Sequence, residues 1–154
     1  MEPTPTVGFL LHDAARLLRK RFEQRSRSSG LTRSQWQVLA YLAAHEGIHQ
    51  GALAELLDIE AITLVRLLDK MEARGLVERR RHPTDRRIWQ LFLKPDARPL
   101  LDLMKVTGKV TRDEAFKGMT EAEQERLLQT LPLIKSNLLE ACSQPVDEQE
   151  ARHG

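Results

Sequence analysis

Two short helix-forming segments joined by a tight turn constrain the fold of this chain more than any other feature of its sequence. Apolar residues at helical spacing predict a helix over residues 51–57 and a second over residues 61–74. Asp58-Ile59-Glu60 lies between them and has the composition of a turn. The residues of the second helix that this spacing points inward are Ile62, Val65, Leu68 and Met71. The pattern predicts a helix-turn-helix.

The periodicity changes after the second helix. Gly75 supplies a helix stop, and residues 76–81 and 87–93 are compatible with β-strands. His82-Pro83-Thr84-Asp85 has good turn chemistry between them, so the two strands should form a hairpin. A helix-turn-helix followed by a hairpin is a winged helix-turn-helix.

Helical patterns also flank this unit. An apolar stripe predicts a first helix over residues 9–27. Thr32 and Gln35 form a capping box that opens a helix ending near Gly47. Pro95 fits the first turn of a further helix that extends to about residue 118.

A second capping box, made by Thr120 and Glu123, opens the last helix. Pro132 lies inside this helix and predicts a kink. The expected fold class is therefore mainly α with a small β-hairpin: a winged helix-turn-helix with additional helices at both ends.

The second helix of such a unit has the size to lie in the major groove of DNA, where each base pair presents a distinct pattern of donors and acceptors. Its first residues would point at base edges, which makes Ile62, Thr63 and, one turn later, Arg66 the candidate base readers. Thr63 can hydrogen-bond or make a methyl contact, and Arg66 can fork onto a guanine. An ordinary exposed helix arginine is the alternative for Arg66.

Basic residues concentrate in two segments. Residues 74–87 hold six arginines against two acids, and residues 16–27 hold six basic residues against one acid, whereas residues 120–154 are acidic. A polyanion would favour the first two segments, and arginine suits a minor groove or a phosphate. The basic residues expected at the hairpin tip are Arg79, Arg80, Arg81, His82, Arg86 and Arg87. The alternative is that these arginines only solvate a surface hairpin.

The run Leu-Leu-Asp-Lys-Met-Glu-Ala-Arg-Gly-Leu-Val at residues 67–77, with Asp85-Arg86-Arg87 after it, resembles the MarR family of transcription regulators. Ile59-Glu60 followed by Leu64-Val65-Arg66 resembles the SlyA branch most, and the likeness extends over about residues 7–139. At residues 93–98 the chain has Leu-Lys-Pro-Asp-Ala-Arg, where the family usually has a Leu-Thr pair and a glycine. We therefore expect a different cap at this junction.

The resemblance implies a homodimer with intertwined first and last helices, which leaves one wing and one recognition helix for each half-site of a pseudo-palindrome. It also implies that Asp85 orients the wing and that Arg86 or Arg87 enters the minor groove. From the basic hairpin itself, Arg80 and Arg81 are further candidates for binding DNA. The apolar stripes of the terminal helices agree with a dimer, although an intrachain helical pair is the alternative.

The same resemblance divides the chain into four parts. Residues 1–30 would be an N-terminal dimerisation helix, residues 31–94 the winged helix-turn-helix DNA-binding domain and residues 95–142 the C-terminal dimerisation helices. Residues 143–154 would be a flexible tail, because they offer little to bury.

Relatives of this type often release DNA when a phenolic compound or an aromatic carboxylate enters a pocket between the dimer helices and the winged domain. Arg16 and Trp36 occupy the matching positions here, and His12 lies one helical turn before Arg16. They would offer a cation, a flat apolar wall and a titratable hydrogen-bond partner. The alternative places Trp36 in the core and leaves Arg16 and His12 solvated or at an interface.

Other function classes fit the sequence poorly. The histidines show no metal-ligand spacing, and we find no phosphate-binding glycine loop or nucleophile motif, so we expect no enzyme, metal or cofactor. No apolar run is long enough to span a bilayer. The single cysteine, Cys142, fits a reducing cytoplasm, and we expect it to be partly buried. A winged helix that binds protein, and an activator or counter-silencer that displaces DNA-coating proteins, are the alternatives to a ligand-responsive repressor.

Overall fold

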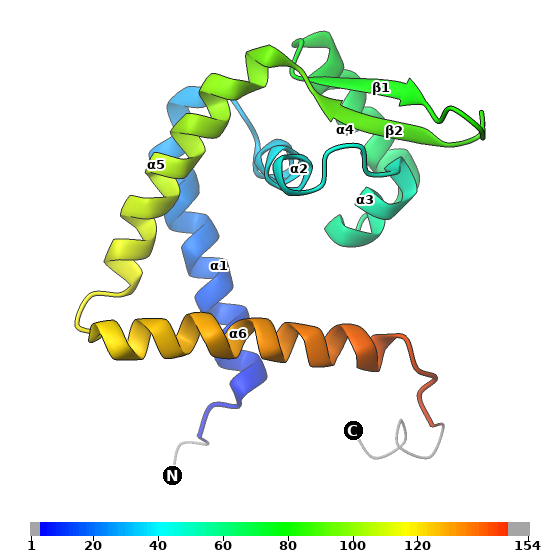
Figure 1. Ribbon diagram of the computed structural model, residues 1–154. Helices are drawn as coiled ribbons and strands as arrows, with labels where there is room; N and C mark the ends of the chain where they lie inside the picture. Colours follow the sequence, from blue (N-terminus) through cyan, green and yellow to red (C-terminus); the bar gives the residue numbers. More distant parts are fainter. Residues whose placement is uncertain (1–3, 148–154) are drawn as a thin grey trace. The chain divides into compact units, whose positions relative to one another are not determined.

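The computed structural model describes residues 4–147, which contain six α-helices, two short 3-10 helices and one two-stranded antiparallel sheet (Figure 1). The mainly α fold with a small β-hairpin is thus confirmed. The chain divides into two compact units, one ending at Ala115 and the other beginning at Phe116. The elements of the first unit are α1 (Val7–Ser26), η1 (Arg27–Ser29), α2 (Arg33–Ala44), α3 (Gln50–Leu57), α4 (Ala61–Ala73), β1 (Val77–Arg81), β2 (Trp89–Leu93), η2 (Pro95–Ala97) and α5 (Arg98–Ala115). The second unit contains α6 (Glu121–Cys142).

Both predicted capping boxes are present. At α2, the backbone N–H of Gln35 donates to the Thr32 hydroxyl at 3.3 Å, and the Thr32 N–H donates to the Gln35 side chain at 3.0 Å. The equivalent pair at α6 joins Thr120 and Glu123 at 3.2 Å and 2.9 Å. Each box satisfies backbone donors that would otherwise lack a partner at the start of a helix.

The buried face of α4 differs from the one predicted. Leu64, Leu68 and Met71 have no exposed surface, whereas Ile62 is 57% exposed and Val65 is half-buried. The prediction that Ile62 points inward was wrong, because two residues before Leu64 is nearly the opposite side of a helix with 3.6 residues per turn. Leu64 begins the row that packs into the core.

The sheet is a β-hairpin that comes directly after α4 in the sequence (Figure 1). Its register pairs Val77 with Leu93 and Arg81 with Trp89. Gly75 at φ 71° ends α4 in the left-handed region that glycine adopts without strain, and the Lys94 N–H donates to the Leu76 carbonyl at 2.9 Å to close the hairpin base. The strands are shorter than predicted, because residues 87 and 88 belong to the connection.

The hydrophobic core joins α2, α3, α4 and the hairpin. Its fully buried side chains include Leu39 and Leu42 of α2, Leu53 of α3, and Val77 and Leu91 of the two strands. Each of these helices and strands is short. Burial of their side chains against one another therefore supplies most of the stability of each element. α3 and α4 are thereby held at a fixed angle to the hairpin.

The C-terminal helices differ from the predictions in detail. The predicted helix from Pro95 begins as η2, and α5 proper extends from Arg98 to Ala115. α6 continues through Pro132 to Cys142, whose side chain is exposed, so the expected partial burial of this cysteine was wrong for the single chain. Within residues 4–147, none of the helices combines the length and apolar character needed to cross a membrane.

Candidate nucleic-acid interface

The first turns of α4 present side chains away from the core. Ala61, Ile62 and Thr63 are exposed, and so is Arg66, which lies four residues after Ile62 on the same helix face. Across residues 4–147, no hydrogen bond or ion pair holds the Arg66 guanidinium. Glu60, the N-cap of α4, makes no capping bond with its side chain. The outward face of α4 is thus free to contact another molecule.

A compact turn forms the tip of the hairpin. His82 Nδ1 accepts hydrogen bonds from the backbone N–H groups of Thr84 and Asp85, both at 3.2 Å. Asp85 in turn accepts from the backbone N–H of Arg87 at 3.1 Å and from its guanidinium, also at 3.1 Å. These bonds to Arg87 hold the pKa of Asp85 below its usual range. The side chain of Arg87 is 89% exposed, so Asp85 orients a cation that projects into solvent.

The other arginines of the hairpin are held in different ways. The Arg80 guanidinium lies 4.1 Å from the centre of the Phe92 ring, and that of Arg81 lies 4.0 Å from the centre of the Trp89 ring. Arg81 also donates to the backbone carbonyl of Arg86. The Arg86 guanidinium itself has no partner in the described part of the chain. Arg86 and Arg87 therefore extend from the tip, whereas Arg80 and Arg81 stack against strand β2.

Arg79 forms ion pairs with α4 that its position in the sequence did not indicate. Its side chain is only 20% exposed and donates to Asp69 at 2.5 Å and, through Nε, to Glu72 at 2.8 Å. The prediction that Arg79 lies at the hairpin tip was wrong, because it sits in the middle of β1 and faces α4. Asp69 and Glu72 are three residues apart on α4, which is the one sequence signal for this clamp. The clamp fixes α4 against the hairpin.

The three residues predicted for an effector pocket lie in different environments, one buried and two exposed. Trp36 is 4% exposed in the core, and its ring meets the Phe22 ring edge-on with centroids 5.6 Å apart. Arg16 is exposed and paired with Asp13 at 3.2 Å, and His12 is exposed. The buried indole Nε1 of Trp36 has no hydrogen-bond partner among residues 4–147. A buried N–H without an acceptor is unfavourable. The structure thus places Trp36 in the core and leaves Arg16 and His12 on the surface.

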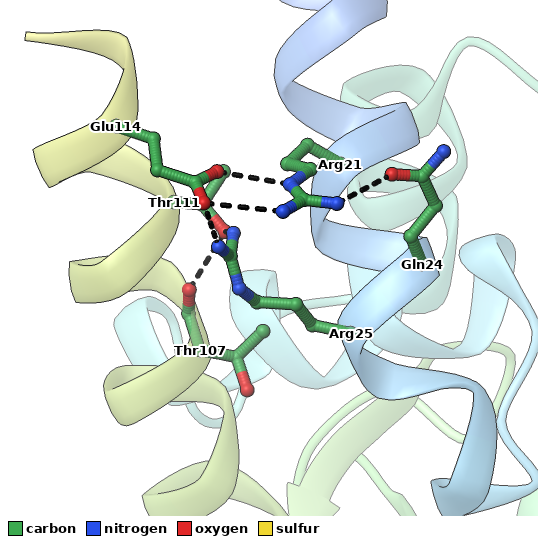
Figure 2. A network of polar contacts seen from close by, with 6 residues as sticks. All are labelled: Arg21, Gln24, Arg25, Thr107, Thr111 and Glu114. Atoms are coloured by element: carbon green, nitrogen blue, oxygen red, sulfur yellow. Dashed lines mark hydrogen bonds and ion pairs between the residues drawn. The ribbon is translucent and has the colours of Figure 1, made fainter.

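A polar network ties α1 to α5, which lie side by side in Figure 1 and are enlarged in Figure 2. The Glu114 carboxylate accepts from Arg21 at 2.9 Å and also from Arg25. Arg25 donates further to the Thr111 hydroxyl at 3.0 Å, and this buried hydroxyl donates to the Thr107 carbonyl at 2.8 Å. Sequence reasoning missed this network, because the partners are about ninety residues apart and no local pattern links them.

Hydrogen bonds from Arg21 and Arg25 lower the pKa of Glu114 from its ordinary value of 4.5 to about 2. A carboxyl whose pKa is depressed by folding stabilises the protein above its unfolded pKa, and this contribution disappears as the pH falls through the folded pKa. We therefore expect Glu114→Gln to lower Tm at neutral pH, with the difference from the wild type shrinking between about pH 5 and pH 2.

Thermal melts followed by circular dichroism across this pH range measure the effect. Asp113→Asn is the matched control, since within residues 4–147 the ion pair of Asp113 is an exposed one with Lys109 on the same helix, and such pairs contribute little. A pH-independent loss of Tm in Glu114→Gln would show that the carboxylate does not act through its charge.

Comparisons with known proteins agree with this geometry. The sequence profile of the MarR family matches residues 29–88, which hold α2, α3, α4 and the hairpin tip. The solved structure of transcriptional regulator PA3341 is 34% identical, covers 88% of this chain and 99% of its own, and superposes with a TM-score of 0.76. The chain belongs to the MarR family.

Other members share the fold at lower identity. A MarR family regulator from Listeria monocytogenes, solved in complex with 26mer DNA, is 23% identical with a TM-score of 0.77, over 90% of this chain and 92% of its own. The transcriptional regulator SlyA is 20% identical with a TM-score of 0.75, over 89% of this chain and 96% of its own. This MarR-family chain thus has the winged-helix fold of transcriptional regulators over nearly its whole described length.

Proposed function

We propose that this chain is a sequence-specific double-stranded DNA-binding transcriptional regulator that acts as a homodimer on a pseudo-palindromic operator. The observation that carries the proposal is the distribution of exposed cations in one compact unit. Arg66 on the outward face of α4 and Arg86 at the wing tip are exposed without a partner in the described chain, and Asp85 directs Arg87 outward. The DNA complex of the Listeria relative, which shares the fold, supports the same reading.

In this proposal the α4 residues Ile62, Thr63 and Arg66 contact base edges in the major groove. The wing residues Arg86 and Arg87 reach the minor groove or the phosphates, with Asp85 as the orienting residue. Arg80 and Arg81, which stack on aromatic rings of β2, bind phosphates of the neighbouring DNA backbone. In the proposed dimer, each subunit makes the same contacts with one half-site of the operator.

Selection of binding sequences from a random double-stranded DNA library tests the proposal. We expect purified protein to enrich a site with two half-sites related by a dyad, spaced by about one helical turn. Failure to enrich any sequence, together with salt-independent or absent DNA binding, would instead favour a winged helix that binds protein.

Arg66→Ala should weaken binding to the selected site by about 1–3 kcal/mol and relax its sequence preference, since a bidentate contact to guanine would be lost. Arg87→Ala is the matched comparison and should weaken binding to selected and scrambled DNA alike. Fluorescence anisotropy with both DNAs measures the difference. If Arg66→Ala reduced both affinities equally, Arg66 would be a phosphate contact and not a base reader.

The exposed apolar side chains of the terminal helices support the homodimer. In α1, Phe9 and Leu10 are 63% and 54% exposed, and in α6, Leu138 and Leu139 are 57% and 62% exposed. Such a concentration of exposed leucine and phenylalanine is unusual for a monomer and is typical of an interface. A second copy of the chain is the occupant that the family resemblance implies.

Release of DNA by a small aromatic carboxylate or phenol is the regulation we propose, in the manner of a ligand-responsive repressor. In this proposal Arg16 and His12, which are both exposed, would supply a cation and a hydrogen-bond partner, and Trp36 a flat apolar wall. We expect salicylate to weaken DNA binding in the wild type and not in Arg16→Ala. Unchanged DNA affinity with salicylate and with benzoate would contradict this regulation while leaving DNA binding intact.

A further inference from the structure

Ile62 is a large apolar side chain placed where α4 faces away from the core. It is 57% exposed, whereas Leu64 and Leu68 of the same helix have no exposed surface. Ile62 and Arg66 are four residues apart and so share one face of the helix. A branched aliphatic group and an unpaired guanidinium thus stand together on the outward side of α4.

Exposed apolar side chains are rare in this part of the molecule. Of residues 31–94, all of which the structure describes, Leu56 and Ile62 are the only exposed large apolar residues, at 43% and 57%. The others lie on α1, α5 and α6 and close to the end of α6. The proposed dimer explains the exposed apolar side chains of the terminal helices, but it does not explain why Ile62 is exposed.

Arginines on the same helix face and in the same compact unit favour a polyanion as the partner of Ile62. Arg66 lies one turn along the same face, and the wing of the same compact unit adds the exposed cations Arg86 and Arg87. In the major groove, thymine is the base that presents an apolar group, its C5-methyl, at the base edge. Ile62 is the second residue of α4, and the first residues of a recognition helix are the ones that reach base edges.

We propose that Ile62 packs against thymine C5-methyl groups in the operator and makes half-site preference depend on those methyls. The inference rests on the proposed DNA-binding function and deepens it. It predicts that selected half-sites contain thymine at a position facing the start of α4. It also assigns Ile62 and Arg66 different readouts on one face, an apolar contact and a bidentate hydrogen bond.

Replacement of thymine by deoxyuridine in the selected site tests the proposal, because uracil keeps every hydrogen-bonding group and lacks only the methyl. We expect wild-type affinity to fall about fourfold for each contacted methyl that is removed. Ile62→Ala should bind the thymine site more weakly and should be insensitive to the uracil substitution. Leu56→Ala is the matched control, since it removes the other exposed apolar side chain of the helix-turn-helix and should retain uracil sensitivity.

Both variants alter exposed positions, and thermal melts should show that they remain folded. Wild-type protein that prefers the selected site over scrambled DNA but binds thymine and uracil sites equally would overturn the role of Ile62 and leave the proposed function standing. Uracil sensitivity retained in Ile62→Ala would overturn it as well. Absence of any preference for the selected site would contradict the proposed function itself.

Discussion

Leu131→Glu combined with Leu138→Glu should convert the protein to a monomer and weaken binding to a two-half-site operator by about 10²–10⁴-fold. Both leucines line an open apolar groove on one face of α6, together with Ile134, Lys135, Leu139 and Cys142. Two carboxylates there would have to lose their hydration inside an interface, which is unfavourable. The operator affinity falls because each half-site is then bound independently.

Ser136→Glu combined with Asn137→Glu is the matched control, since it adds the same charge to exposed positions of α6 outside the groove-lining residues. The leucines are also exposed in the single chain, so neither double variant should disturb a folded core. Light scattering gives the mass, and fluorescence anisotropy gives the operator affinity. A dimeric mass with unchanged affinity in the leucine variant would show that this face of α6 is not the interface.

Leu68→Ala should reduce the free energy of unfolding by about 2–5 kcal/mol, the largest effect on stability that we expect from one substitution. Leu68 has no exposed surface and packs from α4 into the core shared by α2, α3 and the hairpin. Truncation removes buried apolar surface and leaves a cavity that the surrounding short elements cannot fill without moving. The same change should loosen α4, so DNA affinity should fall with stability.

Lys70→Ala, at an exposed position of the same helix, is the stability control and should change the free energy of unfolding by no more than about 0.5 kcal/mol. Urea denaturation followed by circular dichroism measures both variants. Equal stabilities for Leu68→Ala and Lys70→Ala would contradict the assignment of Leu68 to a single close-packed core.

Local signals in the sequence predicted the helix boundaries well. Thr32 with Gln35 and Thr120 with Glu123 form the expected capping boxes, and Gly75 ends α4 with positive φ. These features depend on residues only three or four positions apart, so the sequence contains the whole interaction. The order of helices and the position of the hairpin follow from them.

Features that depend on tertiary partners were predicted less well. Ile62 was assigned to the buried face of α4 because it is apolar, although Leu64 occupies that face in the structure. Arg79 was grouped with the tip arginines, since the sequence does not show that Asp69 and Glu72 of α4 face it. The roles of the candidate DNA and effector residues stay predictions, because they require a second molecule.

The measurement that tests the account most directly is a fluorescence-anisotropy titration of the full chain against its selected operator and a scrambled duplex of the same composition. At physiological salt we expect the operator to bind at least about a thousandfold more tightly, and both affinities should fall steeply as salt increases. Equal affinity for the two duplexes, or binding that does not respond to salt, would contradict the claim that this protein is a sequence-specific DNA-binding regulator.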